Sequence, residues 1–127
     1  MTPGYYRTHL SRYNVDVELT ATKRVGFHKY TFLGNESPAI VFDMVNGGCW
    51  DKTTEAVIRV VNDSTVSGYR YSKGWADDQC VFFRAEFSRK FDNVEFIVND
   101  SVKEGDMAKG AQLFARVNFA AGNQEPV

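Results

Sequence analysis

The sequence predicts an all-β protein, an antiparallel β-sandwich with little or no helix. About eight or nine strand-like segments follow one another at roughly ten-residue spacing, separated by clusters of Gly, Asn, Asp and Ser. No segment shows the roughly 3.6-residue apolar period of an amphipathic helix. The chain has 127 residues, of which 43% are hydrophobic. We therefore expect a single domain, residues 1–127, with a substantial buried core.

The first strong pattern runs from residue 15 to residue 32. Residues 15–21 alternate apolar and polar side chains, which is the period of a strand with one buried face. Residues 25–32 form a second run, rich in β-branched and aromatic side chains. Because no helix-length segment separates the two runs, we expect an antiparallel pair of strands. Residues 3–7, which precede the pair, are expected to form an extended arm.

Three further strands are expected in the middle of the chain. Residues 39–42 are wholly apolar, which favours a strand buried on both faces. A glycine-rich loop follows at residues 46–48. Residues 55–61 and 65–71 then flank an Asn-Asp-Ser turn, so their spacing predicts a β-hairpin.

The C-terminal part of the sequence contributes the clearest alternation. Residues 79–88, 94–99 and 111–119 each read as a strand, whereas residues 100–109 are polar and contain glycine, and are expected to form a loop. Phe82 and Phe114 lie opposite the expected core-facing side chains. These apolar outer faces suggest either that another structure covers one sheet or that aromatic side chains pack laterally over the strands.

Composition excludes several classes of partner. The net charge of −1 gives no general attraction to nucleic acid or to anionic lipid. No apolar run approaches the roughly 18 residues of a membrane-spanning helix, and we expect no signal peptide within residues 1–127, because the first residues lack a charged segment followed by an apolar one. The two cysteines, Cys49 and Cys80, make neither a disulfide framework nor a metal site. Cys80 is expected to be a small buried hydrophobe, with a Cys49–Cys80 bridge as the alternative.

Two loops carry the candidate ligand-binding residues. Trp75 and Asp78 could line a sugar subsite, because an aromatic face stacks on sugar C–H groups and a carboxylate accepts hydroxyl hydrogen bonds. Trp50 with Asp51 offers the same chemistry, and the alternative for each loop is turn capping and packing on the end of the sandwich. The adjacent carboxylates Asp77 and Asp78 do not suit glycoside hydrolysis, which needs two carboxylates on opposite sides of the scissile bond. We therefore assign no catalytic residue and no metal ligand.

Motifs along nearly the whole chain are similar to those of glycoside hydrolase family 92. The motifs, in order, are Pro3-Gly4-Tyr5-Tyr6, Glu18-Leu19-Thr20-Ala21-Thr22, Arg24, Gly26, His28, Tyr30-Thr31-Phe32, Gly74-Trp75-Ala76, Asp78-Gln79, Phe83 and Phe87-Ser88. The family pattern prefers Arg at the position of Lys29 and often has Pro at the position of Leu33.

This resemblance implies the N-terminal β-sandwich domain of a calcium-dependent, exo-acting, inverting α-mannosidase, with its catalytic acid and base in a later helical domain. It implies a bacterial, periplasmic or secreted parent enzyme that acts on mannose-containing glycans. Calcium would serve the parent enzyme without being bound by these residues, and the helical domain of the same parent chain would be the partner. We expect a fragment that is cut at both ends and inactive alone. A missing edge strand would favour a strand-exchanged homodimer.

Two other functions remain open from the sequence. One is a stand-alone carbohydrate-binding β-sandwich with Trp50 or Trp75 as the stacking platform. The other is a structural or interaction domain whose apolar outer face docks a partner.

Overall fold

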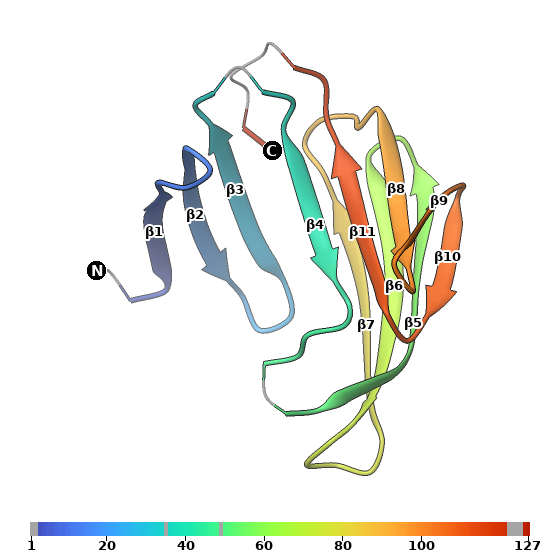
Figure 1. The fold of residues 1–127 in the computed structure, drawn as a ribbon. Helices are drawn as coiled ribbons and strands as arrows, with labels where there is room; N and C mark the ends of the chain where they lie inside the picture. The colour runs from blue at the N-terminus through green and yellow to red at the C-terminus, as the bar shows by residue number, and fades with distance from the viewer. Residues whose placement is uncertain (1–2, 35, 49, 122–125) are drawn as a thin grey trace. The chain divides into compact units, whose positions relative to one another are not determined.

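The computed structural model describes residues 3–34, 36–48, 50–121 and 126–127. The described residues form strands and turns and no helix, which confirms the predicted all-β class, and no helix among them could cross a membrane. They divide into two compact units, residues 39–119 and residues 1–38 with 120–127 (Figure 1). Each unit is built on antiparallel sheets.

The N-terminal unit contains a three-stranded antiparallel sheet in the order β1-β2-β3. The strands are β1 (Tyr5–Leu10), β2 (Val15–Ala21) and β3 (Gly26–Phe32). The expected β2–β3 pair forms, with Val17 opposite Tyr30. The expected extended arm is instead the paired strand β1, with Tyr6 opposite Leu19. All but one residue of β1 are exposed, so the strand has no apolar face to reveal it in the sequence.

The edge of β3 that faces away from β2 pairs with Val127. The Tyr30 amide donates to the Val127 carbonyl at 2.8 Å, and the Val127 amide donates to the Tyr30 carbonyl at 3.0 Å. This reciprocal pair is the pattern of an antiparallel ladder. Strand β3 therefore offers hydrogen-bonding groups on the side away from β2.

The second unit contains two four-stranded antiparallel sheets, in the orders β10-β5-β6-β7 and β4-β11-β8-β9 (Figure 1). The strands of the first sheet are β5 (Lys52–Asn62), β6 (Thr65–Lys73), β7 (Gln79–Glu86) and β10 (Met107–Gly110). Those of the second are β4 (Ala39–Asp43), β8 (Asn93–Val98), β9 (Ser101–Glu104) and β11 (Leu113–Asn118). The predicted hairpin is confirmed as β5–β6, with Asn62 opposite Thr65.

The core of this unit lies between the two sheets. Alternate residues of the central strands are fully buried: Ala56, Ile58 and Val66 from one sheet, and Phe96, Leu113, Ala115 and Val117 from the other. The sheets meet where the rings of Phe42 on β4 and Phe83 on β7 stack at 5.6 Å. The inward-facing residues therefore follow the period-2 pattern that predicted these strands.

Two expectations about the second unit are wrong. Residues 100–109, expected as a loop, form β9 and β10, which are outer strands of their sheets and are mostly exposed. Strand β4, expected to be buried on both faces, is also an outer strand of its sheet, and Val41 is 59% exposed. Strands β9 and β10 lack the apolar alternation from which strands are recognised. Strand β4 shows that an apolar run alone does not reveal which strand is central.

Candidate functional site

The two tryptophan-bearing loops lie together in the second unit. One loop joins β4 to β5 and carries Trp50, and the other joins β6 to β7 and carries Trp75. They are in direct contact, because a Cβ placed on Gly74 would lie 2.6 Å from the Cβ and 2.8 Å from the Cα of Asp51. Trp50 is 65% exposed and Trp75 is 88% exposed. The fold thus presents two large aromatic side chains to solvent on adjacent loops.

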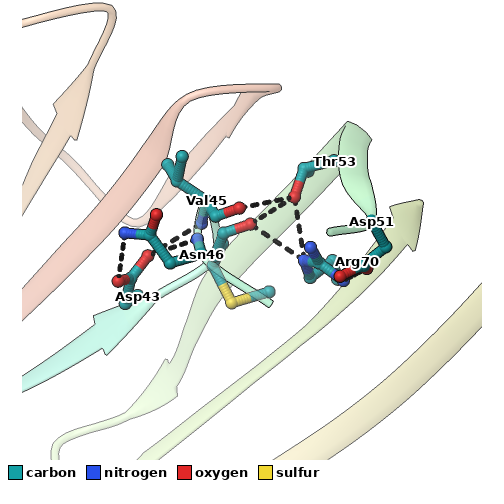
Figure 2. A network of polar contacts seen from close by, with 7 residues as sticks. Asp43, Val45, Asn46, Asp51, Thr53 and Arg70 are labelled. Carbon is teal, nitrogen blue, oxygen red and sulfur yellow. Dashed lines mark hydrogen bonds and ion pairs between the residues drawn. The ribbon is translucent and has the colours of Figure 1, made fainter. Parts of the chain in front are cut away.

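Arg70 of β6 holds the first of these loops at both ends (Figure 2). Its Nε donates to the Met44 carbonyl at 3.1 Å and to Thr53 Oγ1 at 2.8 Å. Its Nη1 donates to Asp51 Oδ2 at 2.6 Å. The Arg70 and Asp51 side chains are only 15% and 9% exposed, so water screens this ion pair less than the pairs on the surface. The Arg70–Asp51 pair therefore fixes the loop against the sheet.

Two carboxylates in this network are stabilised in the ionised form. The hydrogen bond from Arg70, followed by one from Ser72, lowers the pKa of Asp51. Partial burial acts to raise the pKa of Asp43, but hydrogen bonds from Asn46 and Val45 outweigh it and lower that pKa. Asp43 accepts both backbone amides at 2.9 Å and so closes the turn that starts the loop. Asp51, which sequence reasoning grouped with Trp50, is thus engaged in holding Arg70.

The predicted binding residues Trp75 and Asp78 both lie in the β6–β7 loop and are exposed. Asp78 lies close enough to the outward-facing Tyr71 for its charge to act there: the hydrogen bond with Cys80 raises the pKa of the Tyr71 phenol, and the Asp78 carboxylate adds to this. The structure brings Trp75 beside the loop of Trp50. The Asp51 side chain points inward and pairs with Arg70, whereas Asp78 is exposed to solvent.

Arg70 is the residue of this site that sequence reasoning missed. It lies on β6 in the alternating series Val66, Gly68, Arg70 and Ser72, which faces the other sheet. A charge at an inward-facing position must be paired, because an isolated buried charge is costly. A guanidinium in the expected strand 65–71 was therefore the available signal that a carboxylate lay nearby.

The expectation that Cys80 is buried is wrong. Cys80 carries a free thiol and is exposed. It lies opposite Tyr71 in the β6–β7 register, on the outer side of the sheet, whereas Phe83 and Ala85 face inward. The side-chain alternation of the strand decides this, because Cys80 and Phe82 share one face and Phe83 lies on the other. Cys49 lies outside the described residues.

The described residues do not fit a calcium site. No group of three or more His, Cys, Asp or Glu side chains gathers among them in a way that could hold a metal ion. Calcium requires about six to eight oxygen ligands. We therefore derive no chemical step of this chain through calcium.

The contact between the two loops predicts a strong effect of substitution at Gly74. In Gly74→Ala the new Cβ would lie 2.8 Å from the Asp51 Cα, so the backbone must shift, and we expect a loss of about 1–3 kcal/mol in unfolding free energy. Urea denaturation measures this loss. Gly48→Ala is the matched control, because its Cβ would meet nothing within 4 Å. Equal effects of the two substitutions would contradict the proposed loop contact.

The second unit is an antiparallel β-sandwich with exposed tryptophans on adjacent loops, and it accompanies a smaller three-stranded sheet. The chain belongs to glycoside hydrolase family 92, since the model of the Glycosyl hydrolase family 92 N-terminal domain matches residues 1–127. This confirms the family suggested by the sequence motifs.

Solved structures of the same family share this fold. The family GH92 alpha-mannosidase BT3965 from Bacteroides thetaiotaomicron is 30% identical with a TM-score of 0.86, over 95% of this chain and 18% of that one. The family GH92 inverting mannosidase BT2199 from the same species is 22% identical with a TM-score of 0.79, over 98% of this chain and 16% of that one. The GH92 glycosyl hydrolase ccman5 is 18% identical with a TM-score of 0.81, over 98% of this chain and 18% of that one.

The chain thus spans less than one fifth of the length of each of these three structures. A sequence comparison with curated proteins gives no match.

Proposed function

We propose that this chain is the non-catalytic N-terminal part of an exo-acting, inverting α-mannosidase. The family match over residues 1–127 carries the proposal, and the 30% identity to an α-mannosidase at a TM-score of 0.86 supports it. The catalytic acid and base would belong to a helical domain of the same parent chain. Calcium would be bound by the parent enzyme outside this chain, and the parent enzyme would act in the periplasm or outside the cell.

The contribution of this chain to substrate would come from the β6–β7 loop. Trp75 would stack on the C–H face of a mannose residue, and the exposed Asp78 carboxylate would accept hydrogen bonds from its hydroxyls. The Arg70–Asp51 pair would act as a positioning element, because it holds the neighbouring Trp50 loop against which Gly74 packs. None of these groups would transfer a proton to the glycosidic bond.

An activity assay and a mass determination test the proposal together. The purified chain should not turn over 4-nitrophenyl α-mannoside, with or without added calcium. An antibody raised to the chain should detect, in source cells, a product several times larger than 14.4 kDa. Turnover by the chain alone would contradict the non-catalytic assignment. A native product near 14 kDa would contradict the proposed parent enzyme and favour a stand-alone sugar-binding module, which the exposed tryptophans would also suit.

Binding of mannosides by this chain alone should be weak and should depend on Trp75. We expect methyl α-mannoside to change the tryptophan fluorescence of the chain. The Kd should lie in the millimolar range, which corresponds to a binding free energy of about −4 kcal/mol. Trp75→Ala should abolish the saturable change, because it removes the stacking face. Tyr13→Ala is the control, since Tyr13 is an exposed aromatic residue outside both loops. A titration that is unchanged in Trp75→Ala would remove Trp75 from the proposed subsite.

We also propose that the chain alone forms a strand-exchanged homodimer. The outer edge of β3 carries backbone groups that pair with Val127 at Tyr30, so the edge is competent to accept a further strand. Sedimentation velocity should show a dimer whose share of the protein increases with protein concentration. A strictly monomeric chain at high concentration would contradict it.

A further inference from the structure

The outer face of the β10-β5-β6-β7 sheet carries two neighbouring rows of side chains with different chemistry. One row is apolar and aromatic apart from its first member, and the next row carries two guanidinium groups. Across the four strands the registers give the rows Lys109, Val57, Tyr69, Phe82 and Met107, Arg59, Ser67, Arg84. The rows face away from the core, because Ile58 and Ala108, which alternate with them, are buried.

All of these side chains except that of Arg84 line a hollow of about 540 Å³ that is open to solvent. Val57, Tyr69, Phe82 and Met107 form its apolar lining, and Ser67 leaves it room because its side chain is small. Phe82 is 71% exposed, so a large aromatic surface is open to solvent beside the hollow. The volume lies within the range of about 300–1,000 Å³ that is typical of sites for small molecules.

The charge lining the hollow is cationic. Arg59 and Lys109 line it, and no carboxylate does. Lys109 already pairs with Glu55 at 2.8 Å, and Glu55 also accepts the Tyr69 hydroxyl at 2.7 Å. Arg59 forms no ion pair with any described residue. The hollow thus combines an apolar wall with an unpaired guanidinium, whose planar donors suit a carboxylate or a phosphate.

We propose that this hollow is a second carbohydrate site, which binds a pyranose carrying one carboxylate or phosphate group. The anion would bind to Arg59, and the C–H face of the ring would pack against Phe82. The choice of a sugar rests on the proposed function, whereas the requirement for an anion and an apolar face rests on the lining of the hollow. The site is separate from the β6–β7 loop, because none of its lining residues belongs to that loop.

Calorimetry and two-dimensional amide NMR on the whole chain test the proposal. The probes are glucuronic acid and mannose 6-phosphate, with methyl α-mannoside as the neutral sugar and inorganic phosphate as the anion without a ring. We expect both acidic sugars to bind and to shift the amide signals of β5, β6, β7 and β10. Methyl α-mannoside and inorganic phosphate should each bind at least about tenfold more weakly, because each lacks one of the two recognised features. The two acidic arms show whether the site prefers a carboxylate or a phosphate.

Matched variants assign the binding to the hollow. Arg59→Gln should weaken the acidic sugars by about ten- to a hundredfold, the loss expected for a hydrogen bond to a charged group. Lys103→Gln is the control, because it removes the same charge from exposed β9 of the other sheet. Phe82→Ala should also weaken the binding of the acidic sugars. Because the Phe82 side chain is exposed, its removal should not unfold the chain, so unfolding would not explain the weaker binding.

Several results would overturn the proposal. These are equal loss in Arg59→Gln and Lys103→Gln, equal affinity for inorganic phosphate and mannose 6-phosphate, or no shifts on the four strands. A dimer that buries this face and is disrupted by Phe82→Ala would also overturn it, since a second copy would then occupy the hollow. The parent-enzyme proposal is tested by different measurements: the mass of the native product, and the titration of Trp75→Ala with the neutral mannoside.

Discussion

Replacing Arg70 with Met should lower the melting temperature of the chain by about 10 °C, because it breaks a largely buried ion pair and leaves its partner in place. The Asp51 carboxylate would lose its 2.6 Å bond, and the Met44 carbonyl would lose the donor at 3.1 Å. Circular dichroism during heating measures the change. Methionine keeps the length of the side chain, so lost packing contributes little to the result.

The surface pair Arg84–Glu86 provides the control for this prediction. Its atoms are also close, at 2.7 Å, but its side chains are 55% and 67% exposed. Exposed pairs contribute little because water screens the charges and the side chains lose freedom. Arg84→Met should therefore shift the melting temperature by no more than about 2 °C. Similar shifts in Arg70→Met and Arg84→Met would show that burial does not set the strength of these pairs.

The same pair gives an acid-dependent stability with a definite sign. The hydrogen bond from Arg70 lowers the pKa of Asp51 below its ordinary value of 3.8. A carboxyl group whose pKa is lower in the folded chain stabilises that chain above the unfolded pKa, and the stabilisation disappears as the pH falls through the folded pKa. The difference in melting temperature between wild type and Asp51→Asn should thus be constant near neutral pH and shrink below about pH 4. A difference that grows on acidification would contradict this assignment.

The parts of the fold that were predicted from the sequence are those with one buried face. Strands β2, β8 and β11 place an apolar residue at every second position because one side of each is covered, although Ile97 and Phe114 are apolar on the other side. The Asn-Asp-Ser turn marks the β5–β6 hairpin. Strands β9 and β10 did not show this signal, since their exposed residues need not be apolar. One cue to β9 was present in the sequence, the adjacent turn residues Asn99 and Asp100. In the structure they form the turn between β8 and β9, with φ angles of 49° and 63°, the left-handed conformation of two-residue hairpin turns.

The candidate sites show a similar division. The exposure of Trp75 and the apolar outer face at Phe82 follow from their positions in a loop and on the second side of a strand. The partner of Arg70 did not follow, because Asp51 is 19 residues away and a contact of that separation depends on how the loop folds back. The hollow beside Arg59 depends on the registers of four strands, which single-sequence patterns do not specify.

Truncation of Phe96 should be the most damaging single change in the core. Its side chain is fully buried on β8, and β8 lies between β11 and β9 with Ala115 on one side and Lys103 on the other. Phe96→Ala removes a ring from the layer between the two sheets and leaves a cavity that its neighbours fill only in part. We expect a loss of about 3–5 kcal/mol in unfolding free energy, measured by urea denaturation.

The control for Phe96 is Phe82→Ala, which removes the same atoms from a side chain that is 71% exposed on the outer face. Because little apolar surface of Phe82 is buried in the chain alone, its loss should stay within about 1 kcal/mol. A large destabilisation by Phe82→Ala would mean that the outer aromatic cluster stabilises the fold. A small one, together with weakened binding of acidic sugars, would separate the role of Phe82 at the hollow from that of Phe96 in the core.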